Sequence, residues 1–268
     1  MQSGQARPHA GRGGHAARST VSCTALNDMG CGVGELSARH LAPLPADGVV
    51  TEFELAEFTE SPGKFHGREL PANPAPQVWW NQLTEPALVL GSTQRVEHVV
   101  DKVACANANV EIVRRRSGGG AVLLIPGQVV WFDVIVPTGA VAGLGGDVHA
   151  PMSWLGERLG QSLAPLIDGK ITVKGPGMVS TPWSTLVCFD GFGPGEVLVD
   201  GRKLVGISQR RTRVGSRLQC CWYRSYDPAC LVGLLNVAGR PAVEELAPVA
   251  AFDPDDVQSV LGGLARSL

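Results

Sequence analysis

Apolar and polar residues alternate with two different periods along this chain, and the period changes several times between residues 77 and 223. Short apolar or alternating runs are typical of β-strands, whereas apolar positions three and four residues apart are typical of helices. The pattern predicts helices over 95–108 and 151–166, and strands over 77–80, 87–91, 110–115, 121–125, 129–136, 170–174, 186–189, 196–199, 203–209 and 218–223.

Turn and cap residues add to this picture towards the C-terminus. Asp200-Gly201 separates two predicted strands and indicates a tight hairpin. Asp227-Pro228 and Asp253-Pro254 each place an N-cap acid before a first-turn proline, so each predicts the start of a helix. Strands interleaved with helices predict a single domain of the α/β (mixed α+β) class, with one mixed sheet and helices packed on it.

The N-terminal stretch differs from the rest of the chain. Residues 1–46 are rich in Gly, Ala, Arg, His and Pro and show no sustained period, so we expect a disordered extension. Its first 27 residues contain arginines and no acids, as organelle transit peptides do, but no amphipathic helix is visible. We therefore favour a dispensable extension, with the folded domain spanning residues 47–268.

Composition excludes several classes of protein. A hydrophobic fraction of 44% allows a substantial core, and a formal charge of −2 argues against a generally basic nucleic-acid binder. No apolar run is long enough to span a bilayer, so no membrane partner is expected. Seven cysteines without a C-x-x-C motif argue against a disulfide framework and favour a cytoplasmic protein. The six histidines have no metal-ligand spacing, so no metal site is predicted.

The loop between two predicted strands, Arg114-Arg115-Arg116-Ser117-Gly118-Gly119-Gly120, carries the strongest chemical signal. Three cations followed by three glycines combine positive charge with bare backbone. Such a loop suits a phosphate or adenylate group, because glycines allow positive φ and bring N–H groups within contact distance. The alternative is a tight strand connection with solvated arginines.

Lys203 is the second signal, because it follows the Asp-Gly turn in a chain with five lysines and 18 arginines. A lysine at this position hints that a compact ammonium is needed, one that can sit between two oxygen groups. The alternative is an exposed hairpin lysine. Asp133, which interrupts the apolar run 129–136, either faces the loop arginines or points to solvent from an edge strand.

The two stretches together resemble a known family. The pattern R-R-x-S-G-G-G-A-V, followed some 80 residues later by D-G-R-K-x-x-G-x-S, is similar to lipoate–protein ligases and octanoyltransferases. Residues 86–94 look like that family's P-x-x-x-x-G-x-x-Q element, and residues 126–130 are similar to its P-G-Q-L-V run. The resemblance implies the biotin/lipoate-ligase catalytic domain, a mixed, largely antiparallel sheet flanked by helices, here followed by short C-terminal helices.

The resemblance also implies site residues and a reaction. A ligase of this family activates lipoate or octanoate with ATP and Mg²⁺ as an acyl-adenylate. It then attaches the acyl group to a lysine of a lipoyl domain, in 2-oxoacid dehydrogenase or glycine cleavage proteins. Lys203 would be catalytic, bridging the activated carboxyl and the phosphate. The pocket would be lined by Arg115, Ser117, Gly118, Gly119, Gly120, Ala121, Val122, Leu123 and Lys203.

Two alternatives remain beside the ligase. Cys188 lies 15 residues before Lys203, where one octanoyltransferase branch carries an acyl-accepting thiol. In that case an acyl carrier protein delivers the octanoyl or lipoyl group, Cys188 is the catalytic nucleophile, and ATP is unnecessary. The third reading is a non-catalytic binding relative. Family members often have a histidine shortly after the glycines, where this chain has Leu124-Ile125.

Overall fold

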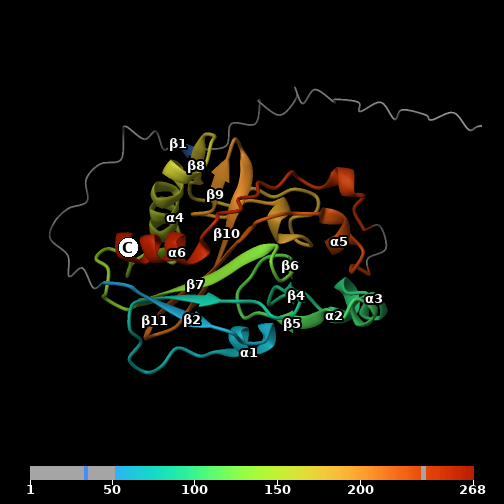
Figure 1. Cartoon of the computed structure of the whole chain (residues 1–268), viewed down its shortest axis with the longest axis horizontal. Coiled ribbons are helices and arrows are strands. Elements are labelled where there is room, and N and C mark those ends of the chain that lie inside the picture. Colours follow the sequence, from blue (N-terminus) through green and yellow to red (C-terminus); the bar gives the residue numbers. More distant parts are fainter. Residues whose placement is uncertain (1–32, 36–51, 237–239) are drawn as a thin grey trace, which may run out of the picture. The chain divides into compact units, whose positions relative to one another are not determined.

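The computed structural model describes residues 33–35, 52–236 and 240–268, and within them the chain forms two β-sheets rather than the single predicted sheet. The larger sheet has eight strands, and a smaller one has three (Figure 1). Sequence periodicity assigns strands but not their partners, which explains why the division into two sheets was not predicted. The predicted mixed α+β class, largely antiparallel and flanked by helices, is confirmed.

The eight-stranded sheet is antiparallel throughout except where β2 pairs with β3 in parallel. Its longest ladder joins β11 to its neighbour β7, and these two strands pair over their full length. The strand order is β1 (Val33–Glu35), β8 (Ile171–Lys174), β9 (Val197–Val199), β10 (Arg202–Arg211), β11 (Gly215–Tyr223), β7 (Val129–Pro137), β3 (Gln77–Asn81) and β2 (Glu54–Phe58).

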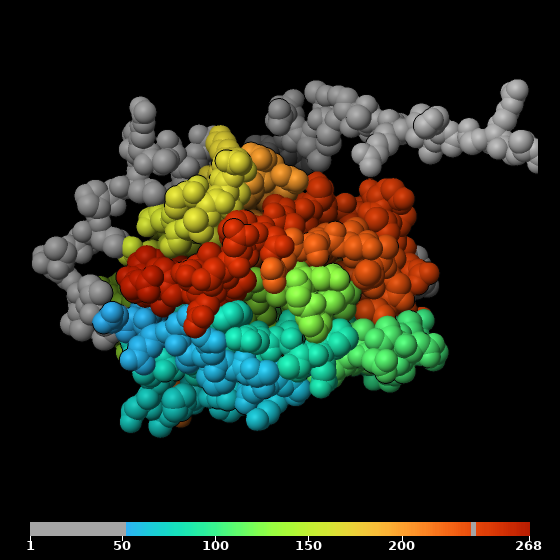
Figure 2. All heavy atoms as spheres, in the orientation of Figure 1, coloured from blue at the N-terminus to red at the C-terminus, as the bar shows by residue number. Residues whose placement is uncertain are grey.

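One face of this sheet is covered by α4 (Ala150–Leu163) and α6 (Val257–Ser267). Leu155, Leu159 and Leu163 of α4 project at helical spacing into a core built from the sheet. Leu261 and Leu264 of α6 join the same core. The space-filling view shows α6 (red) lying between α4 (yellow) and the β2 region (blue), which fits the packing of α6 against α4, β2 and β3 (Figure 2).

The opposite face carries the three-stranded sheet, in the order β5 (Glu111–Arg114), β4 (Ala87–Leu90) and β6 (Val122–Leu124). Val89, Val122 and Leu124 share a second apolar core with Trp131 and Tyr223 of the larger sheet. The far side of the small sheet packs on the short helices α2 (Val96–Val99), α3 (Lys102–Asn107) and α5 (Pro228–Val232). Figure 1 shows this region beside the large sheet, away from α4 and α6.

Local signals explain most of the element boundaries. The predicted Asp200-Gly201 hairpin joins β9 to β10, with positive φ at both turn residues (49° and 75°), as a type I′ turn requires. Asp227 accepts from the Ala229 amide and caps α5, as predicted. The last helix starts later than predicted, because Asp256, not Asp253, is its N-cap.

Two other predicted elements differ from the structure. The helix predicted over 95–108 is divided into α2 and α3, because Val100 is extended and bridges to Leu235 while Asp101 caps α3. The strand predicted over 186–189 is a single bridge, Val187 to Ala121, followed by the 3₁₀ turn η2 (Cys188–Asp190). Two further 3₁₀ turns are η1 (Ala164–Leu166) and η3 (Val243–Glu245).

The N-terminal prediction is only partly within the described residues. Val33–Glu35, which belongs to the extension expected to be disordered, forms β1 and pairs with β8. The rest of residues 1–46 lies outside the described residues. Within the described part of the chain, no helix is long and apolar enough to cross a membrane. The remaining helix, α1 (Pro62–Gly67), lies between β2 and β3 and has a role in the site described next.

Candidate acyl-transfer site

A cavity of about 40 Å³ lies between the two sheets. The small sheet contributes one wall through β4 and β6, and the central strands of the large sheet contribute the other. Its lining is apolar for most of its extent, with a few polar groups at its margins. The lining residues are His66, Val89, Arg115, Val122, Leu124, Trp131, Cys188, Phe189, Gly206, Ile207, Ser208, Gln219, Cys220 and Cys221.

Arg115 connects the glycine loop to the cysteine segment. Its guanidinium donates to the carbonyl oxygens of Gly118 (2.8 Å from Nη2) and Gly120 (3.1 Å), and its Nη2 lies 3.7 Å from Cys188 Sγ. The side chain is only 6% exposed. Arg115 therefore organises the loop from inside and brings a fixed positive charge to the sulfur of Cys188.

The loop glycines allow neighbouring backbone segments to pack closely, in addition to leaving part of the loop accessible. A Cβ on Gly120 would lie 2.7 Å from the backbone of Val187 and Cys188, where no side chain fits. Gly119 has φ +100°, a backbone conformation that favours glycine. Of the three loop glycines, Gly118 alone has open space where a Cβ would lie. The loop and the Cys188 segment are further joined by hydrogen bonds between Ala121 and the backbone of Leu186 and Cys188.

Cys188 differs from the other two thiols of the cavity. It is partly exposed at the start of η2, whereas Cys220 and Cys221 are buried in β11. Burial, with a smaller contribution from Cys188, raises the pKa of Cys221 to about 12, and burial raises the pKa of Cys220 well above its usual value. Both buried cysteines therefore remain thiols at neutral pH, and Cys188 is the thiol with access to solvent.

Lys203 lies beside Cys188 rather than on the exposed hairpin. Its ammonium donates to the Cys188 carbonyl oxygen at 2.7 Å and pairs with Glu196 Oε2 at 2.8 Å. Both side chains are almost fully buried, and the ammonium also lies 5.0 Å from the centre of the Phe189 ring. Burial raises the pKa of the Glu196 carboxyl, and the ammonium opposes that rise. The lysine thus stands between two oxygen groups, as its chemistry suggested.

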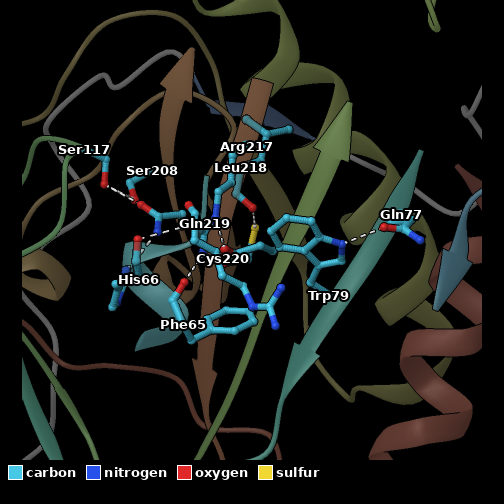
Figure 3. Close-up of polar contacts among 12 residues, drawn as sticks. Phe65, His66, Gln77, Trp79, Ser117, Ser208, Arg217, Leu218, Gln219 and Cys220 are labelled. Atoms are coloured by element: carbon cyan, nitrogen blue, oxygen red, sulfur yellow. Dashed lines mark hydrogen bonds and ion pairs between the residues drawn. The ribbon is translucent and has the colours of Figure 1, made fainter. Parts of the chain in front are cut away.

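Four polar side chains, three of which line the cavity, form a hydrogen-bonded chain (Figure 3). The Ser117 hydroxyl donates to Gln219 Oε1 at 2.7 Å, and Gln219 Nε2 lies 2.9 Å from His66 Nδ1. Ser208 lies 3.1 Å from the Ser117 hydroxyl. The His66 ring lies against Trp131, with ring centres 4.5 Å apart. Ser117, which was predicted as a site residue, therefore holds His66 in place through Gln219. No sequence motif indicated His66.

Asp133 follows neither of the two alternatives weighed from the sequence. It is fully buried and pairs with Arg217 of the adjacent strand β11, at 2.5 Å, rather than with a loop arginine or with solvent. Burial raises the pKa of the Asp133 carboxyl, and the Arg217 charge opposes the rise. Arg217 also donates to the carbonyl oxygens of Phe65 and Arg68 in and just after α1. This pair therefore anchors the short helix that carries His66.

The structure brings most of the predicted residues together. Arg115, Val122 and Cys188 line the cavity, and Ser117 and Lys203 contact residues that do. Ala121 and Leu123 point away from the cavity into the core shared with α2, α3 and α5, because successive residues of a strand face opposite sides. Among the described residues, no group of three or more His, Cys, Asp or Glu side chains is placed to hold a metal ion.

Sequence reasoning missed several residues of the site. His66 lies in a short helix without a recognisable period, so only the structure reveals it. Gln219 had a usable signal, because a polar residue interrupts the apolar run of β11. Glu196 had a signal as well, since it precedes a strand paired across the Asp-Gly turn with the strand of Lys203.

Comparisons with known proteins agree on one family. Residues 67–259 match the family of the lipoyl protein ligase A/B catalytic domain. A curated octanoyltransferase, LipM of Kyrpidia tusciae, is 33% identical over 132 residues, which are 48% of this chain and 47% of the relative. The chain thus matches about half the length of that relative.

Solved structures show the same fold. A lipoate-protein ligase A bound with ATP superposes with a TM-score of 0.59 at 17% identity, over 81% of this chain and 83% of that one. A putative lipoate protein ligase from T. acidophilum with bound lipoic acid gives 0.55 at 16% identity, over 81% and 84%. These likenesses confirm the predicted lipoate-ligase-type fold.

Proposed function

Because this chain belongs to the lipoyl protein ligase A/B catalytic domain family, and is an enzyme of that family, we propose that it is an acyltransferase acting through a thioester on Cys188. It moves an octanoyl or lipoyl group from an acyl carrier protein to a lysine of a lipoyl domain. The observation that carries the proposal is the partly exposed Cys188 thiol, which lines the cavity beside the Arg115 guanidinium.

In the first half-reaction the Cys188 sulfur attacks the carbonyl carbon of the carrier's thioester. A new carbon–sulfur bond forms, the carrier's carbon–sulfur bond breaks, and the thiol proton of Cys188 passes to the departing carrier thiol. The Arg115 guanidinium, 3.7 Å from Sγ, stabilises negative charge at the sulfur and at the oxyanion of the tetrahedral intermediate. We assign the binding of the apolar acyl chain to the cavity between the sheets, because most of its lining residues are apolar.

In the second half-reaction the amine of the acceptor lysine attacks the acyl-enzyme. An amide bond forms, the bond to Cys188 breaks, and the amine's proton returns to the cysteine sulfur. We assign to Lys203 the positioning of the cysteine, because it holds the Cys188 carbonyl and is itself held by Glu196.

One relative supports the proposed acyl donor, and another supports the proposed acceptor. The LipM relative is named an octanoyltransferase, which favours the carrier-dependent reaction. A related structure from T. acidophilum is described as a bi-partite lipoate protein ligase with its E2 lipoyl domain. A lipoyl domain of a 2-oxoacid dehydrogenase or of a glycine cleavage protein is therefore the acceptor that we propose here. A cytoplasmic location follows as part of the same proposal.

An ATP-dependent lipoate or octanoate ligase is the second candidate. It is favoured by the exposed Arg114 and Arg116 beside Gly118, which has open space around it, and by the ATP bound to the lipoate-protein ligase A neighbour. The carboxylates beside Cys188 already have partners, Glu196 with Lys203 and Asp190 with Thr181. In that reaction Mg²⁺ would therefore arrive bound to the phosphates rather than on a preformed carboxylate site.

Mass spectrometry of an intact lipoyl domain separates the two candidates. One reaction contains octanoyl carrier protein without ATP, and the other contains free lipoate or octanoate with ATP and Mg²⁺. We expect modification in the first, together with an acyl-enzyme intermediate on the peptide containing Cys188. Modification in the second reaction alone would reject the transferase and favour the ligase.

Matched cysteine variants test the nucleophile. Cys188→Ala should lower transfer by at least about 10³-fold, because no other group replaces the attacking sulfur. Cys230→Ala is the control, because Cys230 is an exposed cysteine at α5, outside the cavity. Full activity in Cys188→Ala would rule out the thioester mechanism.

A further inference from the structure

His66 presents a hydrogen-bonding atom that the protein leaves unused. The residue is 8% exposed and is one of those that line the cavity. Its Nε2 is buried and has no partner, one of two such side-chain atoms among the described residues. The other, on Asp133, belongs to the ion pair with Arg217 and does not line the cavity. A buried N–H group without an acceptor destabilises the folded protein, so an acceptor supplied by a ligand would be bound favourably.

The direction of the polar chain decides what Nε2 carries. The Ser117 hydroxyl donates to Gln219 Oε1, so the amide nitrogen of Gln219 faces His66 Nδ1 and donates to it. A neutral imidazole that accepts at Nδ1 has its proton on Nε2. Burial, together with the charges of Arg217 and Arg115, lowers the pKa of His66 to about 3. Nε2 is therefore an N–H donor on a neutral ring at physiological pH.

The donor is held in a fixed orientation. Trp131 lies against the imidazole ring, and Gln219 fixes the other ring nitrogen. Arg217 donates to the carbonyl oxygens of Phe65 and Arg68, on either side of His66, and also lies 3.4 Å from the His66 carbonyl oxygen. Such support is typical of a recognition group, because a ligand then binds without the entropic cost of ordering the side chain.

The strand register places this donor away from the reacting sulfur. Phe189, the neighbour of Cys188, packs over Gly206 of β10. Gln219, which binds His66, lies opposite the β10 residue two positions further along. Two strand residues span about 7 Å. An acyl chain attached at Cys188 would therefore reach the His66 donor with atoms several bonds beyond its carbonyl carbon.

Beside its polar lining residues Arg115, Ser208 and Gln219, the cavity has an apolar lining formed by Val89, Val122, Leu124 and Trp131. We propose that His66 Nε2–H recognises an oxygen acceptor in the distal part of the acyl chain, so that the cavity selects hydroxylated or oxo acyl groups over a saturated chain. The inference rests on the proposed acyl-transfer function and specifies its substrate class. A sulfur atom is a weaker acceptor, so a lipoyl group would rank between the two.

Binding of free acids tests the preference without any transfer reaction. Calorimetry on the full-length protein would compare octanoate with octanoates hydroxylated at the terminal, penultimate or preceding carbon. We expect at least one hydroxylated acid to bind about tenfold tighter or more than octanoate, because one paired donor is worth about 1.4 kcal/mol. Equal affinities for all the acids, or no binding by any of them, would overturn the inference.

Variants of His66 locate the effect. His66→Phe should abolish the preference while octanoate still binds, and His66→Gln, which keeps an N–H donor, should retain part of it. His98→Phe is the matched control at an exposed histidine of α2. A uniform loss of affinity for every acid in folded His66→Phe would mean that the histidine contacts the carboxyl end, which also overturns the inference.

This experiment and the test of the proposed function fail independently. The binding measurement needs neither the acyl carrier protein nor the lipoyl domain, nor the thiol of Cys188. A protein that prefers hydroxylated acids but transfers nothing would keep the inference about His66 and reject the transferase. Transfer of octanoyl groups through Cys188, without any preference among the acids, would do the reverse.

Discussion

The two faces of the paired strands β7 and β11 carry side chains of different chemistry. The face towards α4 and α6 is apolar, with Phe132, Val134, Leu218 and Trp222 buried among helix side chains. Because successive residues of a strand point to opposite faces, every second residue of β7 and β11 faces the small sheet instead. That face carries Trp131, Asp133, Arg217, Gln219 and Cys221, all of them buried as well.

Burial alone therefore does not distinguish the structural face from the functional one. On the helix face, stability comes from apolar area and close packing. On the cavity face, the same depth of burial holds a charged pair and a polar chain, each of which must be satisfied by partners. Substitutions on the first face should change stability alone, whereas those on the second should change stability and acyl binding together.

Arg217→Met should give the largest loss on the cavity face. It leaves Asp133 buried without its cation and removes the donor to the α1 carbonyl oxygens, so we expect a loss of about 3–5 kcal/mol in the free energy of unfolding. Urea denaturation measures it. The double variant Arg217→Met, Asp133→Leu should recover part of the loss. A single variant as stable as the parent protein would show that the pair does not support this face.

Leu218→Ala probes the helix face one residue along the same strand. Leu218 is fully buried in the core under α4 and α6, so we expect a loss of about 2–5 kcal/mol from lost apolar contact and the cavity left behind. The kinetic constants and acid affinities of the folded fraction should not change. A shift in KM at constant kcat would indicate that the two faces are coupled through the sheet.

The sequence predicted the elements that depend on local chemistry. The Asp200-Gly201 turn specifies a hairpin by itself, and α4 has a complete helical period, so both were predicted close to their observed bounds. The sequence predicts a strand over 186–189, because Leu186 and Val187 are apolar. They are buried instead in the core beside the small sheet, where Val187 forms an isolated bridge with Ala121, a pairing that local sequence does not encode.

The site was predictable where one loop carries the chemistry and hidden where distant segments meet. Arg115, Ser117 and Lys203 follow from short motifs. His66 does not, because it is held at the cavity by contacts with residues far along the chain, among them Arg217, which follows it by 151 residues. The partner of Asp133 was missed for the same reason, since the pairing of β7 with β11 brings Arg217 next to it.

Gln219→Leu would break the polar chain while keeping the shape of the cavity face. It leaves Ser117 without its acceptor and His66 Nδ1 without its donor, so we expect a loss of about 1–3 kcal/mol in stability. The histidine also becomes free to change its tautomer or orientation, so any preference for hydroxylated acids should weaken. Thermal unfolding and calorimetry together measure both effects, and an unchanged acid preference would contradict the role given to this chain of side chains.

The pH dependence of stability gives the smallest predicted effect. The pKa of His66 is about 3 in the folded protein against an ordinary value of 6.5, so below pH 6.5 the unfolded chain binds a proton that the folded one excludes. The contribution of neutral His66 to the free energy of unfolding is therefore fully present above pH 6.5 and is lost as the pH falls towards 3. About 1 kcal/mol of this free energy is lost between about pH 6.5 and about pH 5.5. His66→Gln should remove that part of the slope, whereas His98→Gln, at an exposed site on α2, should leave it. Urea denaturation at both pH values measures the difference, and equal slopes in the parent and His66→Gln would show that His66 is not held neutral by the cavity face.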